Sequence, residues 1–135
     1  MLIVNPVCSV LWTSQLSPLL QPGAVAQIWR SSRERNERMG LTGAMVFDGE
    51  RFCEFLEGDA DVLAGVCRDI EFDTRHVGMR ILYAAPVAVP RRLVDWRSGY
   101  CDGGDLETFS GPQGLEGEPA LMAFLGLLPR CTLSV

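Results

Sequence analysis

The stretch "LTGAMVFDGERFCEFLEG", residues 41–58, decides the fold. It contains two runs rich in aromatic, aliphatic and β-branched residues, joined through Asp48 and Gly49. An Asp-Gly pair between two such runs is the strongest short-range signal for a β-hairpin. In the second run apolar residues alternate with polar ones, as in a strand with one buried face. The sequence therefore predicts two antiparallel strands, the second of which carries a carboxylate, Glu54, within the alternating pattern.

Helical periodicity flanks the hairpin on both sides. Over residues 24–39, apolar and small side chains recur every three or four positions, and Gly40 follows as a C-terminal stop. Residues 59–72 begin with Asp59 at a plausible N-cap and continue with one apolar stripe. Both segments are expected to be amphipathic helices packed on the same sheet.

Three further runs complete the pattern. Residues 7–14 and 80–89 are predicted strands, and residues 91–100 are a candidate for a short strand or for a turn followed by a strand. After a glycine-rich, acidic stretch, residues 120–128 form a short apolar helix that should pack on the domain, because it is too hydrophobic to lie free.

The order of these elements predicts an α+β protein with a ferredoxin-like β-α-β-β-α-β arrangement, an additional strand and a C-terminal helix. Two helices would cover one face of a mixed sheet, and the terminal helix is the natural cover for the other. We expect a core domain over residues 6–100, followed by a Gly-rich linker and a C-terminal capping helix over residues 101–135.

Composition narrows the possible functions. The 135 residues carry a net charge of −5, and all 12 basic residues are arginine, which excludes lysine chemistry. The basic run "RSSRERNER" is interleaved with Glu34 and Glu37, which favours a solvated helix face over a nucleic-acid surface. No apolar run approaches the roughly 18 residues of a membrane span. The start lacks a charged n-region, so a cytoplasmic protein is expected.

The five cysteines are an odd number without a C-x-x-C pair, and there is one histidine. This pattern favours neither a zinc site nor a disulfide framework. No nucleophile or paired-carboxylate site stands out either. Glu54 and Glu57 are predicted on opposite faces of a strand, because side chains alternate with a period of two. We therefore expect a protein that is not an enzyme.

Several motifs together resemble the BLUF family, the sensors of blue light that use FAD. They are "NERMGLTGAMVFDGERFCEFLEG", "IEFDTRH" and the later "DW", and they occur in the family's order over roughly residues 7–100. The resemblance implies FAD as cofactor, with its isoalloxazine ring between the two amphipathic helices. The chain resembles short BLUF proteins, which often self-associate and bind separate partners. The resemblance therefore implies a homo-oligomer and a separate, unknown protein partner for output.

The resemblance also implies which residues contact the flavin. Asn36 matches the family asparagine whose amide offers donors and an acceptor to the ring edge; a helix-terminal cap is the alternative role. Arg75 would place a cation beside the ring. The remaining cofactor-binding candidates are Arg35 and His76, which flank these two, and the pocket walls Ile28, Ser32 and Val66; Ile28 and Val66 fit a plain core equally well.

The sequence departs from the family at its two central positions. Where the family has a photoactive tyrosine in the first strand this chain has Trp12, and where it has a glutamine in the third strand this chain has Glu54. Trp96 matches the late tryptophan of the family, and Ser98 replaces the methionine that usually follows; both are signalling candidates.

These replacements change the chemistry at the flavin. An indole offers only an N–H donor, and a carboxyl group lacks the O/N asymmetry of the amide that switches in the family. Burial would favour the neutral acid of Glu54, which could then donate one O–H. We expect an FAD-binding sensory protein whose usual blue-light photocycle is altered or lost. The alternative is a flavin-free, BLUF-like protein-interaction module.

Overall fold

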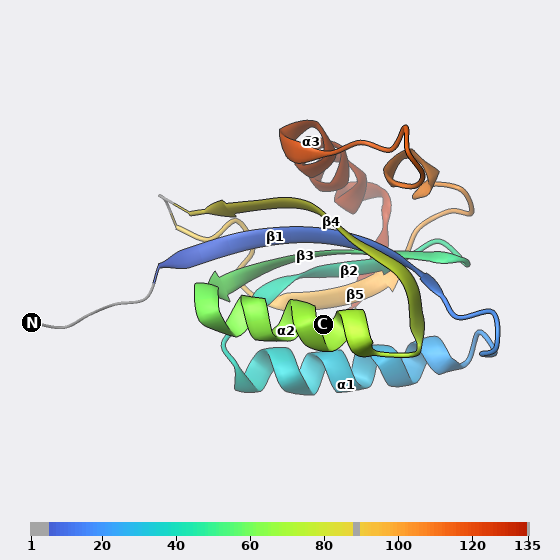
Figure 1. The fold of residues 1–135 in the computed structure, drawn as a ribbon, viewed down its shortest axis with the longest axis horizontal. Helices are drawn as coiled ribbons and strands as arrows, with labels where there is room; N and C mark the ends of the chain where they lie inside the picture. Colours follow the sequence, from blue (N-terminus) through green and yellow to red (C-terminus); the bar gives the residue numbers. More distant parts are fainter. Residues whose placement is uncertain (1–5, 88–89, 135) are drawn as a thin grey trace, which may run out of the picture.

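The computed structural model describes residues 6–87 and 90–134. The described elements follow in chain order (Figure 1): β1 Val7–Leu16, α1 Ala24–Arg38, β2 Thr42–Phe47, β3 Arg51–Asp59, α2 Ala60–Phe72, β4 His76–Pro86, β5 Trp96–Tyr100, the 3₁₀ turn η1 Glu107–Phe109, α3 Gly117–Leu127, the 3₁₀ turn η2 Leu128–Arg130 and β6 Thr132–Ser134. None of the helices within these ranges is long and apolar enough to cross a membrane.

The strands form one sheet in the order β4-β1-β3-β2-β5-β6. Neighbouring strands are antiparallel except for β2 and β5, which run parallel. This mixed sheet confirms the expected α+β, ferredoxin-like arrangement with an additional strand. The predicted hairpin is also confirmed, because β2 and β3 pair directly across the turn at Asp48 and Gly49.

The molecule has three layers. Helices α1 and α2 lie against one face of the sheet, and α3 covers part of the other (Figure 1), as the apolar pattern of residues 120–128 predicts. Alternation along β3 divides the core between these faces: Phe52 and Leu56 join the cluster under α1 and α2, whereas Cys53 and Phe55 join the cluster under α3. Glu54 lies two residues from both Phe52 and Leu56, so its side chain is on the same face of the sheet and faces α1 and α2.

Local signals explain how the first elements begin and end. The Asp59 side chain caps α2 by accepting hydrogen bonds from the backbone of Asp61 and Val62, as predicted. Position 43 in β2 requires glycine because of packing between strands: a Cβ at this position would overlap the carbonyl oxygen of Phe55 on β3. The glycine therefore permits close pairing of the two central strands.

The outer strands differ from their predicted bounds. β4 begins at His76 rather than at residue 80, because its first residues continue the pairing with β1; Gly78, with φ 65°, weakens the strand pattern there. Residues 88 and 89 of the predicted strand lie outside the described residues. β5 begins at Trp96 rather than at residue 91. The three-residue strand β6, which pairs with β5, was not predicted, because so short a run carries little periodicity.

Candidate functional site

Glu54 lies at the centre of a fully buried cluster on the face of the sheet that α1 and α2 cover. Its side chain is 0% exposed. One carboxyl oxygen, Oε1, accepts a hydrogen bond of 2.9 Å from Nε1 of Trp12 on β1. The other, Oε2, accepts one of 2.8 Å from Nε1 of Trp96 on β5. One carboxyl group thus links the two strands that lie on either side of the β2–β3 pair in the sheet.

The environment of Glu54 places its protonation equilibrium near neutrality. Burial raises the pKa of this carboxyl from 4.5 to about 7, while the Arg35 guanidinium and the hydrogen bonds from Trp96 and Trp12 act in the opposite direction. Desolvation therefore outweighs the favourable contacts of the charged form. A proton can be gained or lost at this buried position within a narrow range around pH 7.

The two departures from the family pattern fit each other chemically. Two indole N–H groups need two acceptors, and an ionised carboxylate provides both. A glutamine here would offer one oxygen and turn an NH₂ donor toward the other indole. Trp12 and Glu54 are therefore best understood as one coupled replacement, with Trp96 as the third member. We call Trp12, Glu54 and Trp96 the indole–carboxyl cluster.

A second feature beside this cluster is a pair of unsatisfied donors on α1. Asn36 is 0% exposed, and its Oδ1 accepts a hydrogen bond of 3.2 Å from Nε of Arg35. Nδ2 of Asn36 and Nη2 of Arg35 are buried and have no hydrogen-bond partner among the described residues. Buried donors normally have an acceptor. The carbonyl-bearing edge of a flavin ring would supply acceptors of the right kind, so these residues fit the cofactor.

The other predicted contacts lie at the far end of α2. His76 is buried, its Nδ1 lies 2.8 Å from Oγ of Ser14, and its ring meets that of Trp12 edge-on at 5.4 Å. Burial lowers the pKa of His76 to about 4, so the ring is neutral at pH 7. Arg75 is partly exposed and bonds Asp73 at 2.7 Å and Ser31 of α1 at 3.4 Å. It therefore connects the segment after α2 to α1.

The predicted pocket walls are already packed. Ile28, Ser32 and Val66 are 0%, 5% and 1% exposed. Ile28 and Val66 belong to the same core cluster as Trp12 and Trp96, although they come from different helices. A three-ring system can enter between α1 and α2 only if these side chains move apart.

Trp96 and Ser98 occupy β5, where they face α1. The guanidinium of Arg33 on α1 lies 5.8 Å from the centre of the Trp96 ring, within range of a cation–π contact. Ser98 is 1% exposed and pairs with Met45 of β2 and Ser134 of β6. These two predicted signalling residues therefore connect the indole–carboxyl cluster to α1 and to the last strand.

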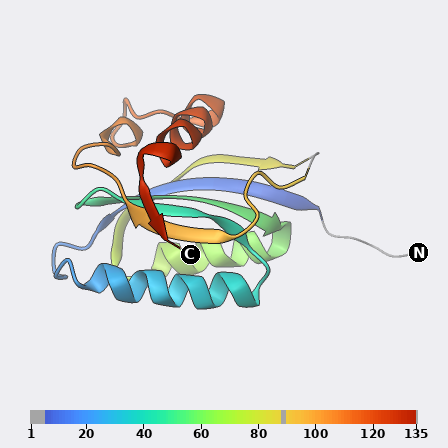
Figure 2. The same cartoon turned by 180° about the vertical axis from the view of Figure 1, so that it is seen from behind.

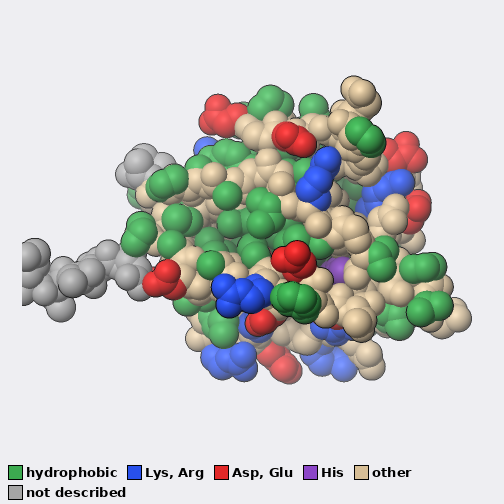
Figure 3. All heavy atoms as spheres, in the orientation of Figure 1, with side chains coloured by type: hydrophobic (Ala, Val, Ile, Leu, Met, Phe, Trp, Pro, Cys, Tyr) green, Lys and Arg blue, Asp and Glu red, His purple; other side chains and the backbone are tan. Residues whose placement is uncertain are grey.

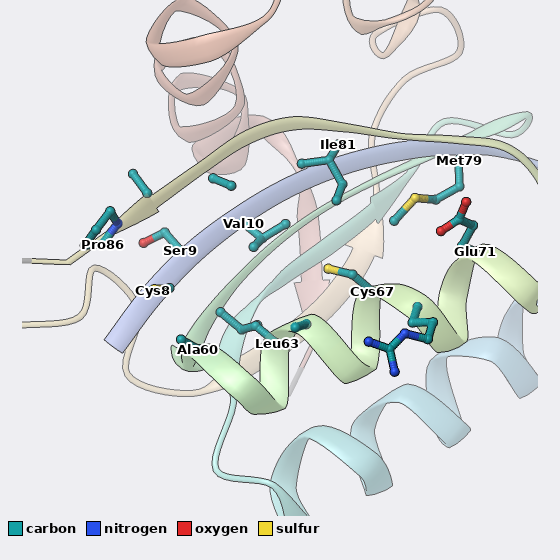
Figure 4. Close-up of a pocket in the computed structure, with 14 residues that line it drawn as sticks. Cys8, Ser9, Val10, Ala60, Leu63, Cys67, Glu71, Met79, Ile81 and Pro86 are labelled. Carbon is teal, nitrogen blue, oxygen red and sulfur yellow. The ribbon is translucent and has the colours of Figure 1, made fainter. Parts of the chain in front are cut away.

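An apolar groove lies on the other side of α2 from the predicted cofactor residues of α1. It has a volume of about 550 Å³ and is lined by residues of α2, β1 and β4, among them Leu63, Cys67, Met79 and Ile81 (Figure 4). In the space-filling view, hydrophobic side chains gather over β1 and β4 beside α2 (Figure 3). None of the predicted cofactor residues lines this groove.

One anchoring residue was not predicted. Glu57 is 0% exposed and accepts hydrogen bonds from Oγ of Ser9 at 3.1 Å and from the backbone of Arg92 and Leu93 at 2.6 and 3.2 Å. These contacts fix the irregular segment that precedes β5, which begins at Trp96. The sequence signal was present, since a second acid in an apolar strand needs buried donors.

Comparison with known proteins supports the family on independent grounds. The model of the BLUF family, described as sensors of blue-light using FAD, matches residues 7–99. No curated protein matches this chain. The fold is similar to that of BlrB, a BLUF protein in its dark state, at 24% identity and a TM-score of 0.70, covering 94% of this chain and 99% of that one.

Two further solved structures share the fold. BlsA in its photo-activated state is 18% identical with a TM-score of 0.70, covering 90% of this chain and 94% of that chain. The Klebsiella pneumoniae BlrP1 manganese and cy-diGMP complex at pH 9.0 is 23% identical with a TM-score of 0.63; the match covers 93% of this chain but 29% of BlrP1. The family match and the shared fold together define a sensory domain of the flavin-binding class. The chain belongs to the BLUF family.

Proposed function

We propose that this protein is an FAD-binding BLUF sensor in which a protonation equilibrium at Glu54 replaces the light-driven amide switch of the family. The observation that supports this is the pair of hydrogen bonds of 2.9 and 2.8 Å from Trp12 and Trp96 to the two oxygens of Glu54. An amide that accepts one bond and donates another can exchange its ends. A carboxylate that accepts two bonds has no such exchange.

The cofactor would be held chiefly from α1. Asn36 and Arg35 each offer a buried donor that has no partner among the residues the structure describes, and Ile28 and Val66 would form the walls once they separate. When bound, FAD would supply an electron-accepting ring, and an external electron donor that reduced it would add negative charge to the site. Negative charge near an ionised carboxylate raises its pKa, so Glu54 would take up a proton.

Proton uptake changes the contacts of the cluster. A protonated Glu54 carries a hydrogen on one oxygen, and that oxygen no longer presents a charged acceptor to the indole N–H facing it. The bond to Trp12 or the bond to Trp96 then weakens. Because Trp96 begins β5, loss of its bond would be transmitted to β5 and β6, and from there to α3. We infer that output to a partner protein or a second copy uses this edge of the sheet.

Absorption spectroscopy tests the proposal. Protein mixed with FAD should show bound flavin, and blue light should produce no reversible red shift of its absorption. Reduction of the flavin should shift the apparent pKa of Glu54 upward from about 7, read from the infrared absorption of its protonated carboxyl. Failure to take up FAD would instead support a flavin-free interaction module, for which the fully satisfied carboxyl of Glu54 is the favouring observation. An ordinary light-induced red shift would contradict the proposed switch.

A further inference from the structure

Two of the five cysteines flank the pairing of β5 with β6: Cys101 directly follows β5 and Cys131 directly precedes β6. The antiparallel register pairs Ser98 with Ser134, Gly99 with Leu133 and Tyr100 with Thr132. Continued by one residue, this register places Cys101 opposite Cys131. Both are free thiols of intermediate exposure. In the reverse view the C-terminal strand lies along β5 (Figure 2).

The two strands approach closely at this point. A Cβ at Gly99 would overlap the carbonyl oxygen of Thr132, so glycine is needed for the close pairing. Opposed residues of antiparallel strands have Cα atoms about 4.5 to 5.5 Å apart, which lies within the range of about 4.4 to 6.8 Å that disulfides span. If the register continues by one residue, it gives the two cysteines a separation that a disulfide can bridge.

The electrostatic surroundings of the two thiols agree with this placement. Burial, followed by the adjacent Cys131 thiol, raises the pKa of Cys101 to about 12. Burial also raises the pKa of Cys131, whose side chain hydrogen-bonds that of Cys101 and donates to the carbonyl of Leu127 at 3.4 Å. The charged groups that face the pair are Asp48, Asp102, Asp105 and Arg130. The mostly acidic surroundings favour the protonated thiols.

We propose that Cys101 and Cys131 form a reversible disulfide that fastens β6 to β5 and so makes the C-terminal segment of this protein sensitive to thiol redox state. With a small-molecule disulfide such as oxidised glutathione, one thiolate attacks and releases one glutathione thiol. The second cysteine then attacks the mixed disulfide, forms the intramolecular bond and releases the second glutathione. Two protein thiols lose two electrons and two protons, and the oxidant gains them.

The bond would act on the part of the molecule that carries α3. Residues 102–130 would become a closed loop containing η1, α3 and η2, fastened to the strand that begins with Trp96. β6 also reaches α1, because Nη2 of Arg33 lies 3.5 Å from the carbonyl oxygen of Ser134. The disulfide would restrict movement of β6 relative to both β5 and α1. This inference is independent of flavin binding.

The raised pKa values of the two thiols determine how fast the disulfide forms. The thiolate is the attacking species, and well below the pKa its fraction increases about tenfold per pH unit. Oxidation by excess oxidised glutathione should therefore be slow at pH 7. Its rate should rise by about tenfold for each unit up to pH 9.

The test is oxidation of the whole protein followed by peptide mapping. Wild type should lose two thiols, yield a Cys101–Cys131 cross-linked peptide and gain on the order of 10 °C in melting temperature, with reversal by dithiothreitol. Cys131→Ser and Cys101→Ser should show no such gain. Cys8→Ser, on β1, is the matched control and should behave as wild type.

Cys53 is the alternative disulfide partner for Cys101, because Cys101 contributes to the raised pKa of the Cys53 thiol. A cross-link between Cys101 and Cys53, cross-links only between chains, or the absence of any cross-link at pH 9 would each overturn the proposal. Cys53→Ser should leave the Cys101–Cys131 cross-link intact.

Discussion

Replacement of Glu54 by glutamine should change how the stability of the protein depends on pH. The pKa of Glu54 is raised from 4.5 in the unfolded chain to about 7 in the folded one. The folded state therefore binds the proton more tightly, and protonation stabilises it. This contribution is fully present below pH 4.5 and is lost as the pH rises through 7. The difference between the two values corresponds to about 3 kcal/mol in the free energy of unfolding.

The assay is urea unfolding of flavin-free protein at several pH values, for wild type and for Glu54→Gln. A measurement on wild type by itself would not isolate Glu54, because His76 also changes the stability with pH. The pKa of His76 is lowered to about 4, so its contribution to stability increases as the pH rises from 4 to 6.5. Both proteins retain His76, and Glu54 is not among the causes of its shift. The difference between the two proteins therefore isolates Glu54.

Relative to the variant, wild type should lose about 3 kcal/mol between pH 4.5 and about 8. Ser98→Ala is the matched control: it alters a buried polar residue of the same sheet face that does not titrate, so its difference from wild type should be constant with pH. A constant difference for Glu54→Gln as well would refute the reasoning that burial governs this carboxyl.

Three further outcomes are expected. Trp12→Tyr combined with Glu54→Gln should restore a reversible red shift under blue light in FAD-loaded protein, while either change alone should not; no shift in the double variant would mean that other residues of the site have also diverged. Asn36→Ala should weaken FAD binding about tenfold, the effect of one lost buried hydrogen bond, in a fluorescence titration; unchanged affinity would assign Asn36 to the helix end alone. Trp96→Phe removes one donor to Glu54 and should raise its pKa further above 7, seen by infrared spectroscopy as a protonated carboxyl persisting to higher pH; an unchanged titration would contradict the geometry of the cluster.

Local signals account for the parts of the fold that the sequence predicts well. The Asp48-Gly49 turn, the Asp59 cap and the helical periodicity of α1 and α2 each depend on neighbours within a few residues. β6 and the start of β5 depend instead on partners far along the chain. Leu93, for example, is held by Glu57, so the local pattern leaves open where the irregular segment ends and where β5 begins. Long-range hydrogen bonds of this kind leave no periodic pattern.

The site, like the fold, has some features that local sequence signals predict and others that depend on long-range contacts. The resemblance identified Glu54, Trp12 and Trp96 as separate positions. The alternating pattern predicted one buried face for residues 52–58, whereas β3 is buried on both faces because helices cover both sides of the sheet. That both indoles donate to one carboxyl depends on the register of four strands, from β1 through β3 and β2 to β5, which periodicity does not fix. The bulge in the β1–β4 pairing between Leu11 and Trp12 adds a local change in strand geometry that no sequence pattern marks.

The indole–carboxyl cluster also explains why the two departures from the family pattern occur together. With Trp12 alone, a glutamine at position 54 would leave one of two buried indole N–H groups without an acceptor, at a cost of about 1 to 3 kcal/mol. With Glu54 alone, the tyrosine of the family could still donate to the carboxylate, but only through a phenol O–H, whose position differs from that of an indole N–H. Trp12 and Glu54 together satisfy every polar atom of the cluster. A carboxyl whose pKa lies near 7 is the consequence of that joint solution, and it gives this BLUF protein a titratable group where the family has an amide.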